Sequence, residues 1–151
     1  MIHCIRTDAQ HPALNDLIPL LDRELAITDG DEHAFYHQFN GLEKIQGIVL
    51  AQVQGEWVGC GAFRRVDASR AEVKRMFVLS SARGRGIAQR VLKELEDWMR
   101  ELNYRACILE TGVNQLPAIR LYERAGFCRI PNYPPYHESP NSICMEKTLA
   151  P

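Results

Sequence analysis

Hydrophobic residues recur at helical spacing in two long stretches of the chain. In the clearer stretch, the apolar side chains between Ile87 and Leu102 lie three or four residues apart, and oppositely charged i,i+4 pairs occupy the other face. The pattern over His11–Ala26 is similar, with Pro12 in the first turn and Pro19 where it could kink or break the helix. Shorter helices are predicted over Glu32–Phe39 and Leu116–Ala125.

Seven shorter runs have the alternating or continuously apolar pattern of β-strands. A tight turn at Gln54–Glu56 joins two of them into a hairpin, and three prolines mark Asn132–Asn141 as a loop. The order of elements predicts a mixed α/β fold whose first half is largely antiparallel. The predicted strands are Ile2–Thr7, Gly47–Val53, Trp57–Arg64, Ala71–Leu79, Ala106–Thr111, Phe127–Ile130 and Ile143–Leu149.

The chain of 151 residues has the size of one domain, which we place at 1–151. Hydrophobic residues make up 46% and charged residues 25%, which argues against a disordered chain. Nucleic-acid-binding domains are strongly basic, whereas the net charge here is −1, so we expect no nucleic-acid partner. No apolar run approaches the roughly 20 residues of a membrane span, and the N-terminus lacks a signal-peptide pattern. We therefore expect a cytoplasmic protein that does not bind membranes.

Cysteine and histidine spacing gives no indication of a metal site or a disulfide scaffold. The five cysteines are far apart and form no CxxC pair. His33 and His37 stand at i,i+4, but no third ligand accompanies them, so we interpret them as a solvated helix face. We expect no bound metal, and we expect small buried hydrophobes at Cys60, Cys107 and Cys144.

A glycine- and arginine-rich loop, Arg83–Ala88, joins a predicted strand to the strongest helix. Backbone N–H groups at a helix start are unpaired, glycine lets an anion approach the backbone, and arginine adds positive charge. The loop is neither a P-loop nor a dinucleotide fingerprint, because no Gly-Lys-Ser/Thr follows and Gln89 replaces the third glycine. We interpret it as a diphosphate-binding loop; a solvated basic connector would have a similar sequence.

Three segments in this order resemble motifs of the GNAT superfamily of acetyl-CoA-dependent N-acetyltransferases. The first is Ala71–Val78, and the second is the loop, where Arg83, Gly86 and Ala88 match the pattern Arg/Gln-x-x-Gly-x-Gly/Ala. The third, Leu121–Phe127, is similar to the family's LYEKxGF pattern. The resemblance covers nearly the whole chain and is that of a small, bacterial-type member. It implies the acyl-CoA N-acyltransferase fold, with a mixed, mostly antiparallel sheet flanked by helices and splayed between its fourth and fifth strands.

The resemblance also implies acetyl-CoA as the acetyl donor. In the family, the pantetheine arm pairs with the backbone of the fourth strand inside the splay, and the diphosphate lies on the loop amides. Many members have an asparagine three residues before the Ala of the last motif. That position is Gln115 here, and its amide offers the same hydrogen-bonding groups. The expected donor-binding residues are Met76, Phe77, Val78, Arg83, Gly84, Arg85, Gly86, Ile87, Ala88 and Gln115.

Two residues match positions that carry catalysis in the family. An amine attacks a thioester only when unprotonated, and an alkylamine has a pKa of about 10.4, so a base must accept its proton. Glu72 matches the general base of some members, and Tyr122 matches the acid that protonates the coenzyme thiolate. The alternatives are that Glu72 only pairs with Lys74 or Arg75 and that Tyr122 only packs in the core.

Six residues are candidates for the acceptor site. Lys74 and Arg75 should point to opposite faces of a regular strand, so either one could enter the cleft and bind a carboxylate. In the family, acceptors lie near the segment between the first two helices and the segment between the last two strands. The candidates are Tyr36, Phe39, Lys74, Arg75, Tyr136 and His137.

These observations predict an N-acetyltransferase that transfers acetyl directly within a ternary complex, because no cysteine occupies a motif position. The expected acceptor is a primary amine of a small molecule or an amino-acid-like compound, with a peptide or protein amine as the alternative. A non-catalytic acyl-CoA-binding or sensing domain would keep the Arg83–Ala88 loop without needing Glu72 or Tyr122. A homodimer is a further alternative, with Ile143–Leu149 as the expected exposed sheet edge.

Overall fold

The structure, a computed structural model, describes residues 1–150. Within these residues, seven strands form one sheet in the order β1-β2-β3-β4-β5-β7-β6, and the pair β4/β5 is parallel while the others are antiparallel. The predicted mixed α/β fold is confirmed. The strands are β1 Ile2–Thr7, β2 Gly47–Val53, β3 Glu56–Arg65, β4 Arg70–Val78, β5 Ala106–Gly112, β6 Cys128–Ile130 and β7 Ser142–Thr148. The α-helices are α1 Leu14–Asp29, α2 His33–His37, α3 Ile87–Glu101 and α4 Leu116–Arg124.

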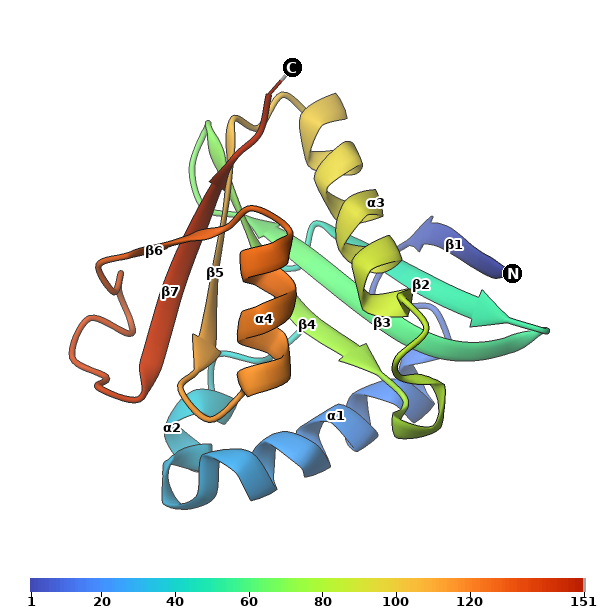
Figure 1. Ribbon diagram of the computed structural model, residues 1–151, viewed down its shortest axis with the longest axis horizontal. Coiled ribbons are helices and arrows are strands. Elements are labelled where there is room, and N and C mark those ends of the chain that lie inside the picture. The colour runs from blue at the N-terminus through green and yellow to red at the C-terminus, as the bar shows by residue number, and fades with distance from the viewer. Residues whose placement is uncertain (151) are drawn as a thin grey trace.

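The sheet buries apolar side chains on both faces. In β2, Val49 and Ala51 pack into the core that contains α3 and α4, and the alternate residues Ile48 and Leu50 pack against α1. A strand with two buried faces needs a continuous apolar run, which explains the lack of polar alternation in Gly47–Val53. Figure 1 shows α3 and α4 together over one face, with α1 and α2 near the end where β4 and β5 separate.

Helix α1 continues through Pro19 without a break. It begins at Leu14 and ends at Asp29, three residues later at each end than predicted. Pro19 is exposed, whereas Leu17 and Leu21 are buried against the sheet. The packing of this apolar face therefore compensates for the backbone hydrogen bond that proline cannot donate. The bounds of the other predicted helices and strands lie within two residues of the observed ones.

Strands β4 and β5 pair only at their start. Their register covers Arg70↔Ala106, Ala71↔Cys107 and Glu72↔Ile108, and beyond Glu72 the two strands diverge. Figure 1 shows the two arrowheads pointing to well-separated places at the lower edge of the sheet. The splay predicted between the fourth and fifth strands is therefore present, and it leaves Val73–Val78 without a partner on the β5 side.

A β-bulge in β4 changes which way its side chains point. The register with β3 shifts between Cys60 and Ala62, and Arg75 has a left-handed φ of 58°. Lys74 pairs with Ala62, which packs on the α1 side, and Arg75 also points to α1, where it bonds Asp22. The expectation that Lys74 and Arg75 occupy opposite faces is wrong, because it assumed an unbroken strand.

The expectation that Ile143–Leu149 forms a sheet edge is also wrong. Strand β7 lies between β5 and β6 and pairs with β5 from Ala106↔Thr148 to Gly112↔Ser142. The edge on this side is β6, which has three residues, and the other edge is β1. Hydropathy does not distinguish the edge position in the sheet from the inner one. An edge strand of only three residues, such as β6, can cover β7 without a long apolar run of its own.

Within residues 1–150, no helix is both long enough and apolar enough to cross a membrane.

Candidate active site

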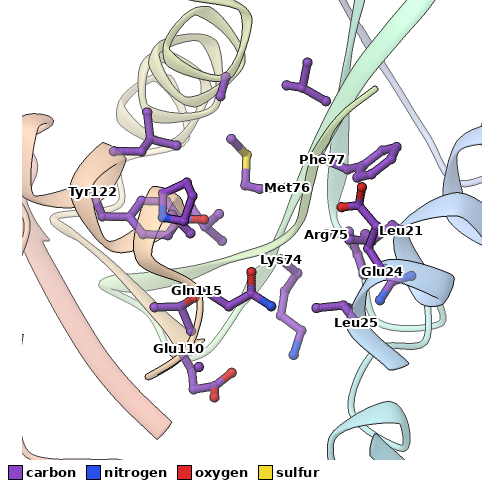
Figure 2. Close-up of a pocket in the computed structure, with 18 of the residues that line it drawn as sticks. Leu21, Glu24, Leu25, Lys74, Arg75, Met76, Phe77, Glu110, Gln115 and Tyr122 are labelled. Atoms are coloured by element: carbon purple, nitrogen blue, oxygen red, sulfur yellow. The ribbon is translucent and has the colours of Figure 1, made fainter. Parts of the chain in front are cut away.

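The splay between β4 and β5 opens into a cavity of about 480 Å³. This volume lies within the usual range of about 300–1,000 Å³ for small-molecule sites. Its walls come from α1, β4, the loop before α3, β5 and α4. Figure 2 shows Tyr122 reaching into it from α4, Met76 and Lys74 from β4, and Glu110 from β5. One cavity thus joins the loop before α3 to residues on the α1 side of the sheet.

The loop before α3 has the geometry of an anion site. Gly84 and Gly86 have φ values of 80° and 77°, and a Cβ at Gly84 would meet nothing within 4 Å. The α3 hydrogen-bond ladder begins with Arg90 N–H donating to the Gly86 carbonyl over 3.1 Å. The N–H groups of the first turn, Ile87–Gln89, therefore have no acceptor within the helix, and the helix dipole favours an anion beside them. These features fit the diphosphate of a coenzyme A thioester.

Arg83 connects this loop to α1. Its Nη2 donates to both carboxylate oxygens of Glu24 over 2.7 Å, and its Nε donates to the Val78 carbonyl over 2.9 Å. The guanidinium also lies 5.7 Å from the centre of the Phe77 ring. Both partners of the Arg83–Glu24 ion pair are about half exposed, so water screens it and an incoming phosphate can compete for the arginine.

Tyr122 and Gln115 project from α4 and the residue preceding it. Gln115 is the N-cap residue of α4, and its amide lies near the middle of the cavity (Figure 2). Tyr122 is 6% exposed and lines the cavity. Burial raises the pKa of the Tyr122 hydroxyl above its usual value, so the group stays protonated at neutral pH. A protonated hydroxyl in this place can donate a proton to a leaving thiolate.

Glu72 lines the cavity but is held on both carboxylate oxygens. It is 1% exposed; Arg64 Nε donates to Oε1 over 2.6 Å, and the Tyr133 hydroxyl donates to Oε2 over 2.5 Å. The sequence suggested Lys74 or Arg75 as its ion-pair partner, but the partner is Arg64 on the adjacent strand. Both oxygens of this carboxylate are therefore occupied, and neither is free to approach an amine.

A second carboxylate in the cavity, Glu110 on β5, was not singled out from the sequence. Burial raises the pKa of Glu110 to about 7, while a hydrogen bond from Ser142 and the charge of Lys74 act in the opposite direction. A base is most effective when its pKa is near the working pH, which is true of Glu110. The signal in the sequence was a single glutamate within the otherwise apolar run Ala106–Thr111.

The acceptor-side candidates are only partly brought together. Lys74, Tyr36 and Tyr136 line the cavity, and the two tyrosine rings are stacked with centres 6.4 Å apart. Arg75 also borders the cavity, but its side chain is 2% exposed and its Nη2 lies 2.5 Å from Asp22 Oδ1.

Of the candidates named from the sequence, all within the described range, three do not line the cavity. Phe39 packs edge-on against Tyr136 from behind, with ring centres 5.7 Å apart, and the side chains of Arg85 and His137 are exposed. The other expected donor-side residues line it; they are Met76, Phe77, Val78, Arg83, Gly84, Gly86, Ile87, Ala88 and Gln115.

The splayed sheet, the amide-rich loop at the start of α3 and the cavity between them define the acyl-CoA N-acyltransferase fold. The chain belongs to the Acetyltransferase (GNAT) family, whose model matches residues 14–127. Family membership makes it an acetyltransferase-type enzyme, as the sequence predicted.

Relatives and solved structures agree with this assignment. The IAA acetyltransferase of Azospirillum brasilense is 36% identical over 151 residues, covering 95% of this chain and 97% of the relative. The N-acetylaspartate synthetase of Danio rerio is 32% identical over 115 residues, covering 76% of this chain and 39% of the relative.

Among solved structures, a Klebsiella pneumoniae protein assigned as an acyl-CoA N-acyltransferase has a TM-score of 0.84 and 28% identity, with 99% of each chain covered. A GNAT family acetyltransferase from Elizabethkingia anophelis, solved with acetyl-CoA bound, has a TM-score of 0.70 at 20% identity, with 98% of each chain covered. At that identity the likeness concerns the fold alone.

Proposed function

We propose that this protein transfers the acetyl group of acetyl-CoA to a primary amine of a small, amino-acid-like acceptor. The transfer is direct, within a ternary complex. One observation carries the proposal: a single cavity joins the open amides at the start of α3 to a buried hydroxyl, Tyr122, and to a carboxylate with a pKa near neutrality, Glu110.

The donor half of the proposal rests on the loop and on the unpaired part of β4. The amides of the first turn of α3 would bind the diphosphate, with Arg83 adding charge. The backbone of Met76–Val78 faces the splay, where β5 no longer pairs with it. An amide-containing pantetheine arm can bond to such an unpaired strand edge. Gln115 supplies one more side-chain amide beside this path.

The chemistry follows from the two ionisable groups. The amine nitrogen attacks the thioester carbonyl carbon, a C–N bond forms, and the C–S bond breaks. Glu110 accepts the proton that the amine loses, and Tyr122 donates its proton to the leaving thiolate. Glu72, the base expected from the sequence, stays an alternative, although Arg64 and Tyr133 already bind both of its oxygens.

Direct transfer is favoured over an acetylated enzyme thiol. No cysteine in the described chain lines the cavity. Cys60 and Cys144 are buried, and burial raises the pKa of their thiols to about 12 and about 11. A thiol that remains protonated is a poor nucleophile at neutral pH.

Two observations support a small acceptor. The cavity is modest in volume, and stacked tyrosines from α2 and the β6–β7 segment line its acceptor end, the part beside Lys74 and Glu110. The name of one relative, N-acetylaspartate synthetase, gives an acetylated amino acid as its product.

Two measurements test this proposal. Calorimetric titration with acetyl-CoA and with CoA tests the donor site, and we expect micromolar binding of both. Thiol release in the presence of small amines, with the acetylated product identified by mass spectrometry, tests transfer. A folded protein that binds neither thioester nor thiol would overturn the proposal. Binding without turnover on any amine would instead indicate an acyl-CoA sensor.

A further inference from the structure

Three cationic side chains border the cavity, and only one of them has no ion pair within residues 1–150. Arg75 pairs with Asp22, and Arg83 pairs with Glu24. Lys74 has no carboxylate within 4.0 Å of its ammonium group in this part of the chain. Its one side-chain hydrogen bond goes to the Tyr136 hydroxyl over 3.5 Å, which is long for such a bond.

The Lys74 side chain is half-buried and lines the acceptor end of the cavity. Figure 2 shows its side chain extending from β4 beside Gln115, on the side of the cavity where Glu110 lies. Burial lowers the pKa of Lys74, while the charges of Glu72 and Glu110 oppose this shift and Arg64 and Arg75 add to it. An ammonium has three donors, only one of which has a protein partner here, and burial makes its charge costly. An anionic ligand group would remove that cost.

The neighbouring carboxylates do not fill this role. Glu72 is bound by Arg64 and Tyr133 on its two oxygens. Glu110 is the group whose pKa lies near 7, and its proposed task is to accept a proton from the acceptor amine. The amine and the Lys74 ligand therefore occupy adjacent places, because Glu110 and Lys74 are close enough for each to shift the pKa of the other.

We propose that the acceptor is an amino acid with a free carboxylate, and that Lys74 binds this carboxylate while Glu110 faces the amine. This inference rests on the proposed acetyl transfer and specifies its acceptor class. It also chooses between Lys74 and Arg75, which the sequence left equal. Arg75 is almost fully buried and already pairs with Asp22, whereas Lys74 is the more exposed cation at the cavity and has no carboxylate partner.

The test compares acceptors that differ only in the carboxylate. The twenty standard L-amino acids and β-alanine are assayed beside their amides with saturating acetyl-CoA, and kcat/KM is measured by thiol release. Four proteins are compared: wild type, Lys74→Met, Lys74→Arg and Lys93→Met. Lys93 is an exposed lysine on α3 that pairs with Asp97, so it is a matched control outside the cavity. Each protein is also titrated with acetyl-CoA.

The readout is the preference for the acid over its amide within one protein, which cancels any loss of folded material. We expect wild type to prefer the best amino acid over its amide by roughly tenfold to a hundredfold, the usual effect of a hydrogen bond to a charged group. Lys74→Met should reduce that preference at least about tenfold, Lys74→Arg should keep most of it, and Lys93→Met should leave it unchanged.

Several results would overturn the inference. Equal rates on acids and amides, or an unchanged preference in Lys74→Met, would exclude carboxylate binding by Lys74 while leaving acetyl transfer intact. Acetyl-CoA binding with no acetylated acid in the panel would exclude the amino-acid class. Failure to bind acetyl-CoA at all would overturn the proposed function itself.

Discussion

Arg64 Nε and Glu72 Oε1 lie 2.6 Å apart across the β3–β4 pair, at register-matched positions of the two strands. The Glu72 side chain is 2% exposed and that of Arg64 is 29% exposed, so the pair anchors the strand at the point where β4 and β5 separate. The same glutamate was the base expected from the sequence. Its ion pair with Arg64 holds β4 to β3 at the residue where the pairing of β4 with β5 ends.

The two glutamates of the cavity should therefore respond differently to removal of their charge. Glu110→Gln should lower kcat by about 10²–10⁴, the usual contribution of a general base. Glu72→Gln should lower kcat by less than about tenfold while reducing stability, because Arg64 loses its charged partner. Steady-state measurement of kcat for both variants at 25 °C shows which glutamate acts as the base. A larger loss of kcat in Glu72→Gln than in Glu110→Gln would make Glu72 the base.

Activity should depend on pH through Glu110. Its pKa of about 7 means that the base is ionised above that pH and protonated below it. With saturating acceptor, kcat should fall about tenfold per pH unit as pH drops below 7. A pH profile of kcat for wild type and Glu110→Gln checks this. The inflection near 7 should vanish in the variant, and its persistence there would assign it to another group.

The raised pKa of Glu110 also makes a prediction about stability. Its folded pKa of about 7 exceeds the ordinary value of 4.5, so between these values the folded state binds more protons than the unfolded state. Stability contributed by this group is therefore lost as pH rises from about 4.5 to 7. Glu110→Gln should be more stable than wild type by up to about 3 kcal/mol at pH 8 and by little at pH 4.5. Urea unfolding at both pH values measures the difference.

Donor binding should depend on the space at Gly86. Gly86→Glu places a side chain and a negative charge where the diphosphate is proposed to lie, so affinity for acetyl-CoA should fall at least about a hundredfold. Gly55→Glu is the matched control. It makes the same substitution at a φ of 82°, in the β2–β3 turn with nothing within 4 Å. Calorimetry on both variants separates a local effect from backbone strain; equal losses would argue against a diphosphate site at Gly86.

Removing the Tyr122 hydroxyl should affect turnover more than binding. Tyr122→Phe keeps the buried ring, so we expect acetyl-CoA affinity within about threefold of wild type and kcat lowered by about 10²–10⁴. Tyr104→Phe is a useful control because its hydroxyl bonds Gln46 Oε1 over 2.6 Å away from the cavity. If Tyr122→Phe retains full kcat with an amine of low pKa and with one of high pKa, the acid role is excluded.

Much of the fold could be predicted from periodicity because local patterns determine where helices and strands begin and end. The stripe from Ile87 to Leu102 and the run Gly47–Val53 were sufficient for α3 and β2. The order of β7 and β6 at the sheet edge could not be predicted in this way, since it depends on pairings between segments far apart in sequence.

The site residues that belong to a sequence motif could be predicted. Those whose role depends on burial in the folded protein could not. The loop Arg83–Ala88 and Tyr122 belong to motifs, and the structure places most of these residues at the cavity. Glu110 matters because of its surroundings: its raised pKa depends on burial that only the assembled strands produce. The partners of Glu72 and Arg75 likewise come from other elements, β3 and α1.

The bulge at Arg75 gives β4 two phases of side-chain alternation. Before it, Glu72 and Lys74 share one face; after it, Met76 and Val78 pack toward α3 while Phe77 packs toward α1. One strand thereby supplies acceptor-side charges on one face and apolar groups near the donor path on the other. If the alternation continued regularly through Arg75, Met76 and Val78 would face α1 and Phe77 would face α3, so the extra residue keeps these side chains on their present faces. The extra residue therefore also lets two neighbouring cations, Lys74 and Arg75, lie on the same side of β4, which regular alternation forbids.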